Sequence, residues 1–274
     1  MSYATLMVYV DADHFPDPRI RLAAGLADKF SATLIGLSAL AIRPPYVTEG
    51  IVIVPSVTEL DINEMTGKLA DTENRFRGVA GAEHRKLEWR SMLDFPIDAL
   101  NREARSADLI VIGQSRGLGD VYRSLDSGRA VLGMGRPTLI VPDGVTSLRA
   151  DHIVIGWKDT REARRAVQDA LPFFHEATRF TVVEICGADE KDAARGHVDD
   201  VIRYLSRHRI KCDPRIVVHQ EGSGAAQLIK LAQDEGADLL VAGAYGHSRL
   251  NEWIFGGITR DLLTTSPICC LLSH

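Results

Sequence analysis

The sequence lacks the marks of several protein classes. No apolar run in its 274 residues approaches the roughly 18–20 residues of a membrane-spanning helix, and the start, residues 1–4, carries no basic segment of the kind that opens a signal peptide. Basic residues are not in excess, because 32 Lys and Arg stand against 37 Asp and Glu, a net charge of −5. We therefore expect a cytoplasmic protein with no nucleic-acid partner and no membrane partner.

Cysteine is scarce and is not spaced for metal or redox chemistry. Four cysteines occur, and none belongs to a Cys-x-x-Cys pair. Cys269 and Cys270 are neighbours in an expected strand, so their side chains point to opposite faces and cannot chelate one ion. We predict reduced cysteines that serve as small buried hydrophobes, and no metal site.

What the sequence does contain is an internal repeat. With 45% hydrophobic and 25% charged residues the chain is globular, and its length suits about two domains of ~150 residues. Three pairs of segments have similar sequences. Segment 107–113 resembles 237–243 and segment 136–141 resembles 266–271, both at an offset of 130 residues. Segment 6–11 resembles 153–158 at an offset of 147. The first half therefore carries about seventeen extra residues, which we place within 41–60 as a surface loop, a hairpin or a lid.

Each half alternates short apolar runs with amphipathic helical patterns in the order β-α-β-α-β-α-β-α-β. This order predicts an α/β fold of two tandem, doubly wound, five-stranded parallel sheets. The turn-rich segment 142–148 separates an expected first domain, 1–144, from a second, 149–274. In the second half we expect strands near 152–157, 180–185, 214–219, 238–243 and 268–272, and helices near 160–174, 192–208, 224–235 and 256–265.

The segment most informative about function follows the fourth strand of the second half. Gly243 and Gly246 allow a tight turn, and Gly256-Gly257 leads into the last helix, whose first N–H groups and dipole favour phosphate. Thr259 adds a hydroxyl there, and Arg249 or Arg260 could add positive charge. On spacing alone, these glycines could equally form only a loop and a helix end.

With this segment, the chain resembles the universal stress protein family. The nucleotide signature of that family is Gly-x2-Gly-x9-Gly-[Ser/Thr]; Gly243, Gly246 and Gly256 fit it, and Gly257 stands where Ser or Thr is usual. The resemblance covers nearly the whole chain as two copies. It implies strand order 3-2-1-4-5 in each domain, ATP where the first and fourth strands adjoin, domains paired about a pseudo-two-fold axis, stress-linked expression and no strong catalytic activity.

Each half departs from the family pattern at a different place. The family has an Asp at the end of the first strand; Lys158 replaces it in the second half, while Asp11 keeps it in the first. In the first half, however, Arg116 and Asp126 replace the second and third glycines, which is hostile to phosphates. We therefore expect ATP, with or without Mg²⁺, in the second half only. The expected contacts, the last by analogy through its backbone, are Gly243, Gly246, His247, Gly256, Gly257, Ile258, Thr259, Trp157, Lys158 and Ile185.

Lys158 carries a separate expectation. Lysine offers donors and no acceptor, so it cannot replace the bond that a carboxylate makes to a ribose hydroxyl. Restoring the acceptor with Lys158→Asp should contribute about 0.5–1.5 kcal/mol and tighten ATP binding by up to roughly tenfold.

Other motifs are weaker. Segment 113–117 matches the Gly-x-Ser-x-Gly nucleophile elbow with Ser115 as nucleophile, but no His-Gly-Gly-Gly oxyanion segment occurs and Gly117-Leu-Gly119 prolongs the loop. Segment 222–224 resembles a dinucleotide fingerprint without its third glycine, and no Walker loop is present.

The sequence thus favours a nucleotide-binding stress protein that acts in signalling or in protection. The alternatives are a nucleotide-free interaction scaffold of the same family and an enzyme. The resemblance implies pairing within the chain and allows a homodimer.

Overall fold

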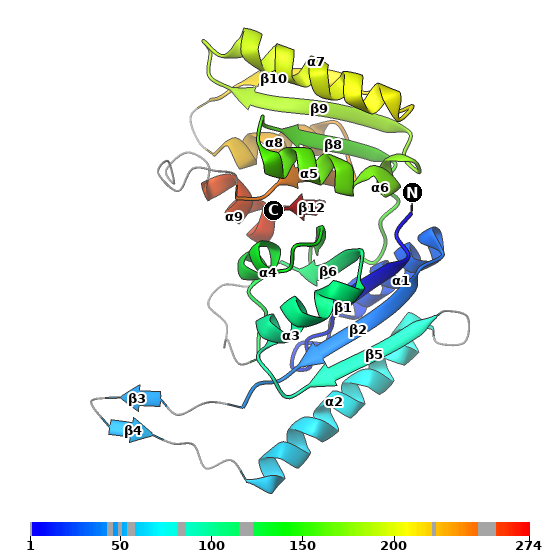
Figure 1. Cartoon of the computed structure of the whole chain (residues 1–274), viewed down its shortest axis with the longest axis vertical. Helices are drawn as coiled ribbons and strands as arrows, with labels where there is room; N and C mark the ends of the chain where they lie inside the picture. Colours follow the sequence, from blue (N-terminus) through cyan, green and yellow to red (C-terminus); the bar gives the residue numbers. More distant parts are fainter. Residues whose placement is uncertain are drawn as a thin grey trace.

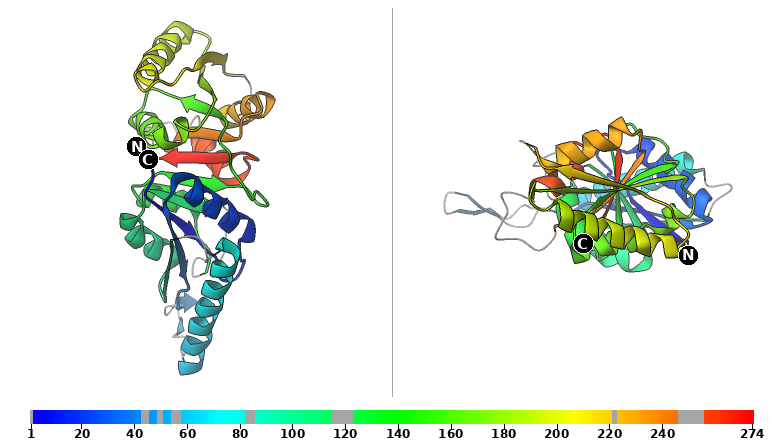
Figure 2. Two further views of the ribbon diagram at one scale, coloured as in Figure 1. Left: turned by 90° about the vertical axis from the view of Figure 1, so that its right-hand side faces the viewer. Right: turned by 90° about the horizontal axis from the view of Figure 1, so that it is seen from above.

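Two sets of five parallel strands join edge to edge into one sheet of ten strands, with helices on both faces (Figures 1 and 2). The strand order is β10-β9-β8-β11-β12-β7-β6-β1-β2-β5. The computed structural model describes residues 2–42, 46–48, 51–53, 58–81, 86–114, 123–220, 223–245 and 256–274. Within these residues, no helix is long and apolar enough to cross a membrane.

The first half supplies strands β1, β2, β5, β6 and β7 of the large sheet, and a small hairpin is inserted after β2. Its elements are β1 Thr5–Tyr9, α1 Asp17–Phe30, β2 Thr33–Ala39, β3 Tyr46–Thr48, β4 Ile51–Ile53, α2 Glu59–Ala80, β5 Leu87–Met92, α3 Pro96–Glu103, the 3₁₀ turn η1 Ala104–Ser106, β6 Leu109–Gly113, α4 Ser127–Gly133 and β7 Thr138–Val141.

The second half repeats the pattern without the insertion. Its elements are β8 His152–Trp157, α5 Arg161–Asp169, α6 Leu171–Phe174, β9 Arg179–Cys186, α7 Lys191–Arg207, β10 Asp213–Val218, α8 Gly224–Asp234, β11 Leu239–Gly243, α9 Gly256–Thr264 and β12 Cys269–Ser273. All five strands lie within a residue or two of the expected ranges. In each half the order is 3-2-1-4-5 once β3 and β4 are set aside, which confirms the predicted fold class.

The two halves meet at an antiparallel ladder between β7 and β12, in which Leu139 pairs with Leu271 and Ile140 with Cys270. These are the last strands of the two halves, and β12 lies within one residue of the range 268–272 predicted from the sequence. All four side chains are at most 1% exposed, so the ladder is covered on both faces. Each strand would otherwise be a bare apolar edge, which is a liability for aggregation. The expected pair of five-stranded sheets is therefore one continuous sheet.

Each face of the sheet is covered by helices from both halves, so two apolar layers run the length of the molecule (Figure 2). One layer packs α1, α2, α5, α6 and α7 against the strands, and the other packs α3, α4, α8 and α9. Tyr3, Phe30 and Phe173 stack edge to face with ring centroids 5.1–5.6 Å apart. Because Phe173 belongs to the second half, this aromatic cluster also holds the halves together.

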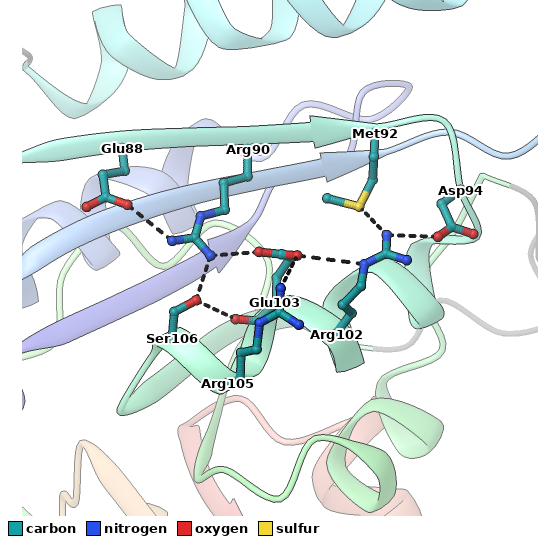
Figure 3. Close-up of polar contacts among 8 residues, drawn as sticks. All are labelled: Glu88, Arg90, Met92, Asp94, Arg102, Glu103, Arg105 and Ser106. Atoms are coloured by element: carbon teal, nitrogen blue, oxygen red, sulfur yellow. Dashed lines mark hydrogen bonds and ion pairs between the residues drawn. The ribbon is translucent and has the colours of Figure 1, made fainter.

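The edge strand β5 is protected by charge (Figure 3). Arg90 on β5 donates to the Glu103 carboxylate on α3 at 2.7 Å, and Arg102 and Arg105 lie 3.7 and 3.6 Å from the same carboxylate. The hydrogen bond from Arg90 to Glu103 raises the pKa of that guanidinium, so the cation is retained. Charged side chains on an edge strand oppose pairing with another sheet.

The inserted segment forms the hairpin expected as one reading of residues 41–60, with β3 paired antiparallel to β4. It projects from the body of the molecule beside the start of α2 (Figure 1). Thr58 caps α2, since its side chain accepts from the Asp61 N–H while the Asp61 carboxylate accepts from the Thr58 N–H. The remainder of the segment, 43–45, 49–50 and 54–57, lies outside the described residues.

Truncating the ladder should destabilise the whole chain. We expect Leu271→Ala to lower the free energy of unfolding by about 2–5 kcal/mol, because a fully buried leucine leaves a cavity where the halves meet. Urea denaturation followed by circular dichroism measures this. Leu132→Ala is the control, since Leu132 is 43% exposed and its truncation should change stability by about 0.5 kcal/mol or less. Equal effects from the two variants would contradict the packing described here.

Candidate functional site

The candidate site lies at the carboxyl ends of β8 and β11, where the strand order of the second half reverses. β8 pairs with β9 on one side and β11 on the other, and its last residue is Trp157. Gly243 is the last residue of β11, and α9 begins at Gly256. Such reversals are where open α/β sheets bind ligands. Gly246 and His247 lie outside the described residues, as do Ser115, Arg116, Arg249, Trp253 and Phe255.

Gly243 is required by a close approach between β11 and α5. A Cβ at this position would lie 2.5 Å from the Ala163 nitrogen and 2.7 Å from the Glu162 carbonyl carbon. Thr160 caps α5, because its hydroxyl oxygen accepts from the Ala163 N–H at 3.3 Å. Only glycine allows the end of the strand to pass this close to the start of the helix. The first glycine of the motif therefore has a packing role whatever the loop binds.

Thr259 fixes the first residues of the loop. Its hydroxyl oxygen accepts from the Tyr245 N–H at 3.2 Å, and the residue is only 4% exposed. Tyr245 has a φ of 54°, in the left-handed region that residues other than glycine seldom adopt. Thr259 is the acceptor in this bond, so the bond does not use the hydrogen of its hydroxyl group. The chain thus bends sharply immediately before Gly246.

Next to this loop, β8 and β9 place a buried donor beside a buried acceptor. Trp157 and Glu184 are paired in register, so their side chains lie on the same face of the sheet. They are 8% and 2% exposed. The Trp157 Nε1–H and the Glu184 Oε2 have no hydrogen-bond partner among the described residues. An unsatisfied buried polar atom costs about 1–3 kcal/mol, so each favours a polar group brought by water or a ligand.

Lys158 is directed towards the same carboxylate. Its Nζ lies 3.9 Å from the Glu184 Oε1, and the His197 Nδ1 lies 3.4 Å from that oxygen. Burial raises the pKa of Glu184, although His197 and then Lys158 oppose the shift. Sequence reasoning missed Glu184. The available signal was a single acidic residue within the otherwise apolar end of β9. The site therefore does contain a carboxylate, supplied by β9 rather than by the end of β8.

Ile185 is the first residue of β9 beyond its ladder with β8, which ends at the pair of Trp157 with Glu184. Its role as the backbone contact of an adenine stays a prediction. The structure describes only the backbone of Gly256, Gly257 and Ile258, which forms the first turn of α9. Across the described ranges, no group of three or more His, Cys, Asp or Glu side chains could hold a metal ion.

Comparison with known proteins bears on this half directly, because residues 150–274 match the model of the universal stress protein family. The second half is a universal stress protein domain. The whole chain superposes on a universal stress protein from Archaeoglobus fulgidus DSM 4304 with a TM-score of 0.74, at 15% identity, covering 100% of this chain and 96% of that one. A functionally unknown protein from Pseudomonas aeruginosa PAO1 gives a TM-score of 0.59 at 11% identity, covering 99% and 92%. These likenesses show that the fold extends over both halves.

Nucleotide binding is recorded among solved universal stress proteins. One was solved in complex with cAMP; it is 22% identical, covers 52% of this chain and 98% of its own, and has a TM-score of 0.37. No curated protein matches the sequence significantly.

The first half shares the universal stress protein fold but has a different site at the equivalent place. A cavity of about 660 Å³ opens at the carboxyl ends of β1 and β6, lined by Asp11 and Gly113 among others. The Arg19 Nη2 donates to the Tyr9 carbonyl at 3.1 Å, and the guanidinium is packed against Gly113. Asp126 caps α4, since its Oδ1 accepts from the Arg129 N–H at 2.9 Å. The helix end that would meet a phosphate already holds a carboxylate.

The role of Gly243 can be tested by adding one methyl group. Gly243→Ala should destabilise the protein by about 1–3 kcal/mol, because both neighbouring atoms belong to backbone that cannot rotate away. The matched control is Gly67→Ala within α2, where a Cβ meets nothing within 4 Å. That change should stabilise by about 0.5–1 kcal/mol. Thermal unfolding of both variants measures the difference, and a stabilising Gly243→Ala would contradict the close approach.

Proposed function

We propose that the second half binds ATP or a related adenine nucleotide, and that the protein acts in the cytoplasm as a nucleotide-responsive signalling or protective protein of the stress response. The observation that supports this most is the position of the glycine segment. Gly243 ends β11 where the strand order reverses, and α9 begins at Gly256 across the loop. A nine-residue helix opened by two glycines offers bare N–H groups to a phosphate.

Within this proposal the residues divide by chemistry. The loop glycines and His247, with the first turn of α9 and the Thr259 hydroxyl, serve the phosphates, with or without Mg²⁺. The Ile185 backbone serves the adenine. Trp157 and Lys158, together with Glu184, border the sugar. The residues proposed as contacts are Gly243, Gly246, His247, Gly256, Gly257, Ile258, Thr259, Trp157, Lys158 and Ile185.

The proposal includes no strong catalytic activity, so any ATP hydrolysis is slow. The second candidate function is a scaffold that binds partners without nucleotide. One observation favours it: in the first half a carboxylate of the protein itself, Asp126, occupies the helix end, so at least this half has no vacant phosphate position there. Mass spectrometry of ligand released from the purified, denatured protein distinguishes the two functions. We also propose that the chain divides into domains 1–144 and 149–274 and that two chains can associate into a homodimer.

One chain should bind one ATP. Isothermal titration calorimetry is expected to give a stoichiometry near one, and Gly246→Val should abolish binding, because a β-branched side chain there blocks approach of phosphate to the backbone. Asp126→Asn in the first half is the control and should leave this site unchanged. Two equivalent ATP sites, or full affinity in Gly246→Val, would refute the assignment.

The pairing of Lys158 with Glu184 decides how the acceptor at this strand end should be tested. Lys158→Asp alone would place a second carboxylate beside Glu184, whose pKa burial already raises, so repulsion would mask any gain. The test therefore compares the double variant Lys158→Asp/Glu184→Gln with the single variant Glu184→Gln. We expect the double variant to bind ATP more tightly, by up to roughly tenfold. Calorimetric affinities of the two variants give the answer. Weaker binding by the double variant would make Lys158 a phosphate ligand.

A further inference from the structure

A hollow with basic side chains lies at the amino ends of β9 and β10, whereas the site proposed in the second half lies at the carboxyl ends of the strands. It has a volume of about 700 Å³ and is bordered by the ends of α6 and α7 and by the segments that lead into β9 and β10 (Figure 1). We call it the basic hollow because Arg207, Arg209 and Lys211 line it. It shares no residue with the proposed nucleotide site.

Every charged or titratable side chain that lines the basic hollow is basic. Besides the cations Arg207, Arg209 and Lys211, the lining includes His175 and His208. The structure describes all the lining residues, and no Asp or Glu is among them. The three cations are exposed to solvent. A concave surface that carries charge of one sign attracts partners of the opposite sign.

These three cations lack the partners that neighbouring basic residues have. Arg203 lies 3.0 Å from the Asp200 carboxylate, and Arg215 lies 3.3 Å from the Glu235 carboxylate. Within the described residues, by contrast, no carboxylate forms an ion pair with any cation of the basic hollow. Their charge is therefore available to a molecule from outside.

Three carboxylates come near the basic hollow without lining it. Glu176 and Asp213 are exposed neighbours in the sequence. The Asp151 carbonyl accepts from the Thr178 hydroxyl, and the Asp151 carboxylate is paired with Arg149 at 2.5 Å. When these three carboxylates and Arg149 are all counted with the three cations, a positive charge remains even with both histidines neutral. The chain as a whole carries a net charge of −5, so this end differs in sign from the average surface.

Arg209 has a backbone conformation that normally favours glycine. Its φ is 66°, and its N–H donates to the Ser206 carbonyl at 3.0 Å just after α7. In the first half, the left-handed residue after the corresponding helix, α2, is Gly81. Glycine would end α7 at a lower conformational cost. An arginine at this position is therefore unfavourable for the backbone, which favours a role for its side chain outside the fold.

The base of the basic hollow disfavours two other anionic partners. Phe174, Phe180 and Ile210 are 2%, 6% and 3% exposed. The two rings are therefore covered and cannot stack on bases, as sites for single-stranded nucleic acids require. The large apolar side chains that are exposed among the described residues all lie outside the lining. The basic hollow thus has no group that would insert into a lipid bilayer.

The arrangement suits the carboxylates of a protein segment. A guanidinium group can bind a carboxylate through two parallel N–H···O bonds, and the basic hollow holds two of these groups beside an ammonium group. Because all three cations are exposed, an extended acidic chain can reach them without entering a closed cavity. The net negative charge of the rest of the molecule repels such a chain elsewhere and directs it to this end.

We propose that the basic hollow is a docking site for an acidic segment of a partner protein, whose Asp and Glu side chains pair with Arg207, Arg209 and Lys211. The surface is separate from the proposed nucleotide site, so the proposal does not depend on nucleotide binding.

Fluorescence anisotropy of a fluorescein-labelled hexaglutamate peptide tests this docking site on the full chain. At about 100 mM NaCl, where charges are screened beyond ~10 Å, we expect Arg207→Glu to weaken peptide binding at least tenfold. The matched control is Arg195→Glu, which reverses an exposed charge on the same helix, about 18 Å away at ~1.5 Å per residue. The control should change the affinity by less than about twofold, because screening removes its effect at that distance.

Arg209→Gly separates a binding role from a structural one. Glycine relieves the left-handed backbone and removes the cation, so this variant should melt about 2 °C higher and bind hexaglutamate at least threefold more weakly. Arg209→Lys keeps the charge and should bind within about twofold of the parent. Unchanged peptide affinity in Arg209→Gly would overturn the role of this residue.

Other occupants of the basic hollow give distinct results. Absence of hexaglutamate binding at millimolar concentration, or equal binding by Arg207→Glu, would overturn the docking site. Tighter binding of a DNA oligonucleotide of the same charge would make it a nucleic-acid site, and equal affinity for inorganic pyrophosphate would make it a small-anion site. Self-association that Arg207→Glu abolishes in analytical ultracentrifugation would make the occupant a second copy of this chain. ATP affinity, measured separately, should be the same in Arg207→Glu as in the parent.

Discussion

The antiparallel ladder between β7 and β12 is the contact on which the rest of the molecule depends. Every other pairing in the large sheet is parallel and joins strands of the same half. The ladder converts two open sheets, each with an apolar edge, into one sheet whose free edges are β5 and β10. Both of these carry charged residues. Burial of Leu139 and Leu271 at the centre thus removes the two strand edges most prone to non-specific pairing.

The same ladder connects the two candidate sites. Gln114 follows Gly113 at the cavity of the first half, and its side-chain Nε2 donates across the ladder to the Ser266 carbonyl, just after α9, at 2.6 Å. In the other direction, the Tyr245 hydroxyl lies 2.6 Å from where a Cβ of Gly128 would stand, at the start of α4. Burial, and then the charge of Asp126, raise the pKa of Tyr245. Each half therefore contacts the other directly beside the strand end that carries its site.

The sequence predicted the repeated framework well and the side-chain chemistry only in part. Strands such as Leu239–Gly243 are short apolar runs bounded by Asp and Gly, so their position and parallel arrangement follow from local pattern. The pairing of Lys158 with Glu184 does not, because it joins adjacent strands separated by a long crossover. The same holds for Arg19, which comes from α1 to fill the space beside Gly113. Spacing within one segment carries no information about a side chain that arrives from another.

The difference between the halves can be traced to one repeated position. At the offset of 130 residues, Asp126 corresponds to Gly256, and each stands where its helix starts. The first N–H groups of a helix have no partner within the helix and must be satisfied from outside. Asp126 satisfies α4 with its own carboxylate, so that helix needs no ligand. Neither Gly256 nor Gly257, at the start of α9, has a side chain that could do the same. The carboxylate at one of these two equivalent positions and the hydrogen at the other thus distinguish the two helix starts.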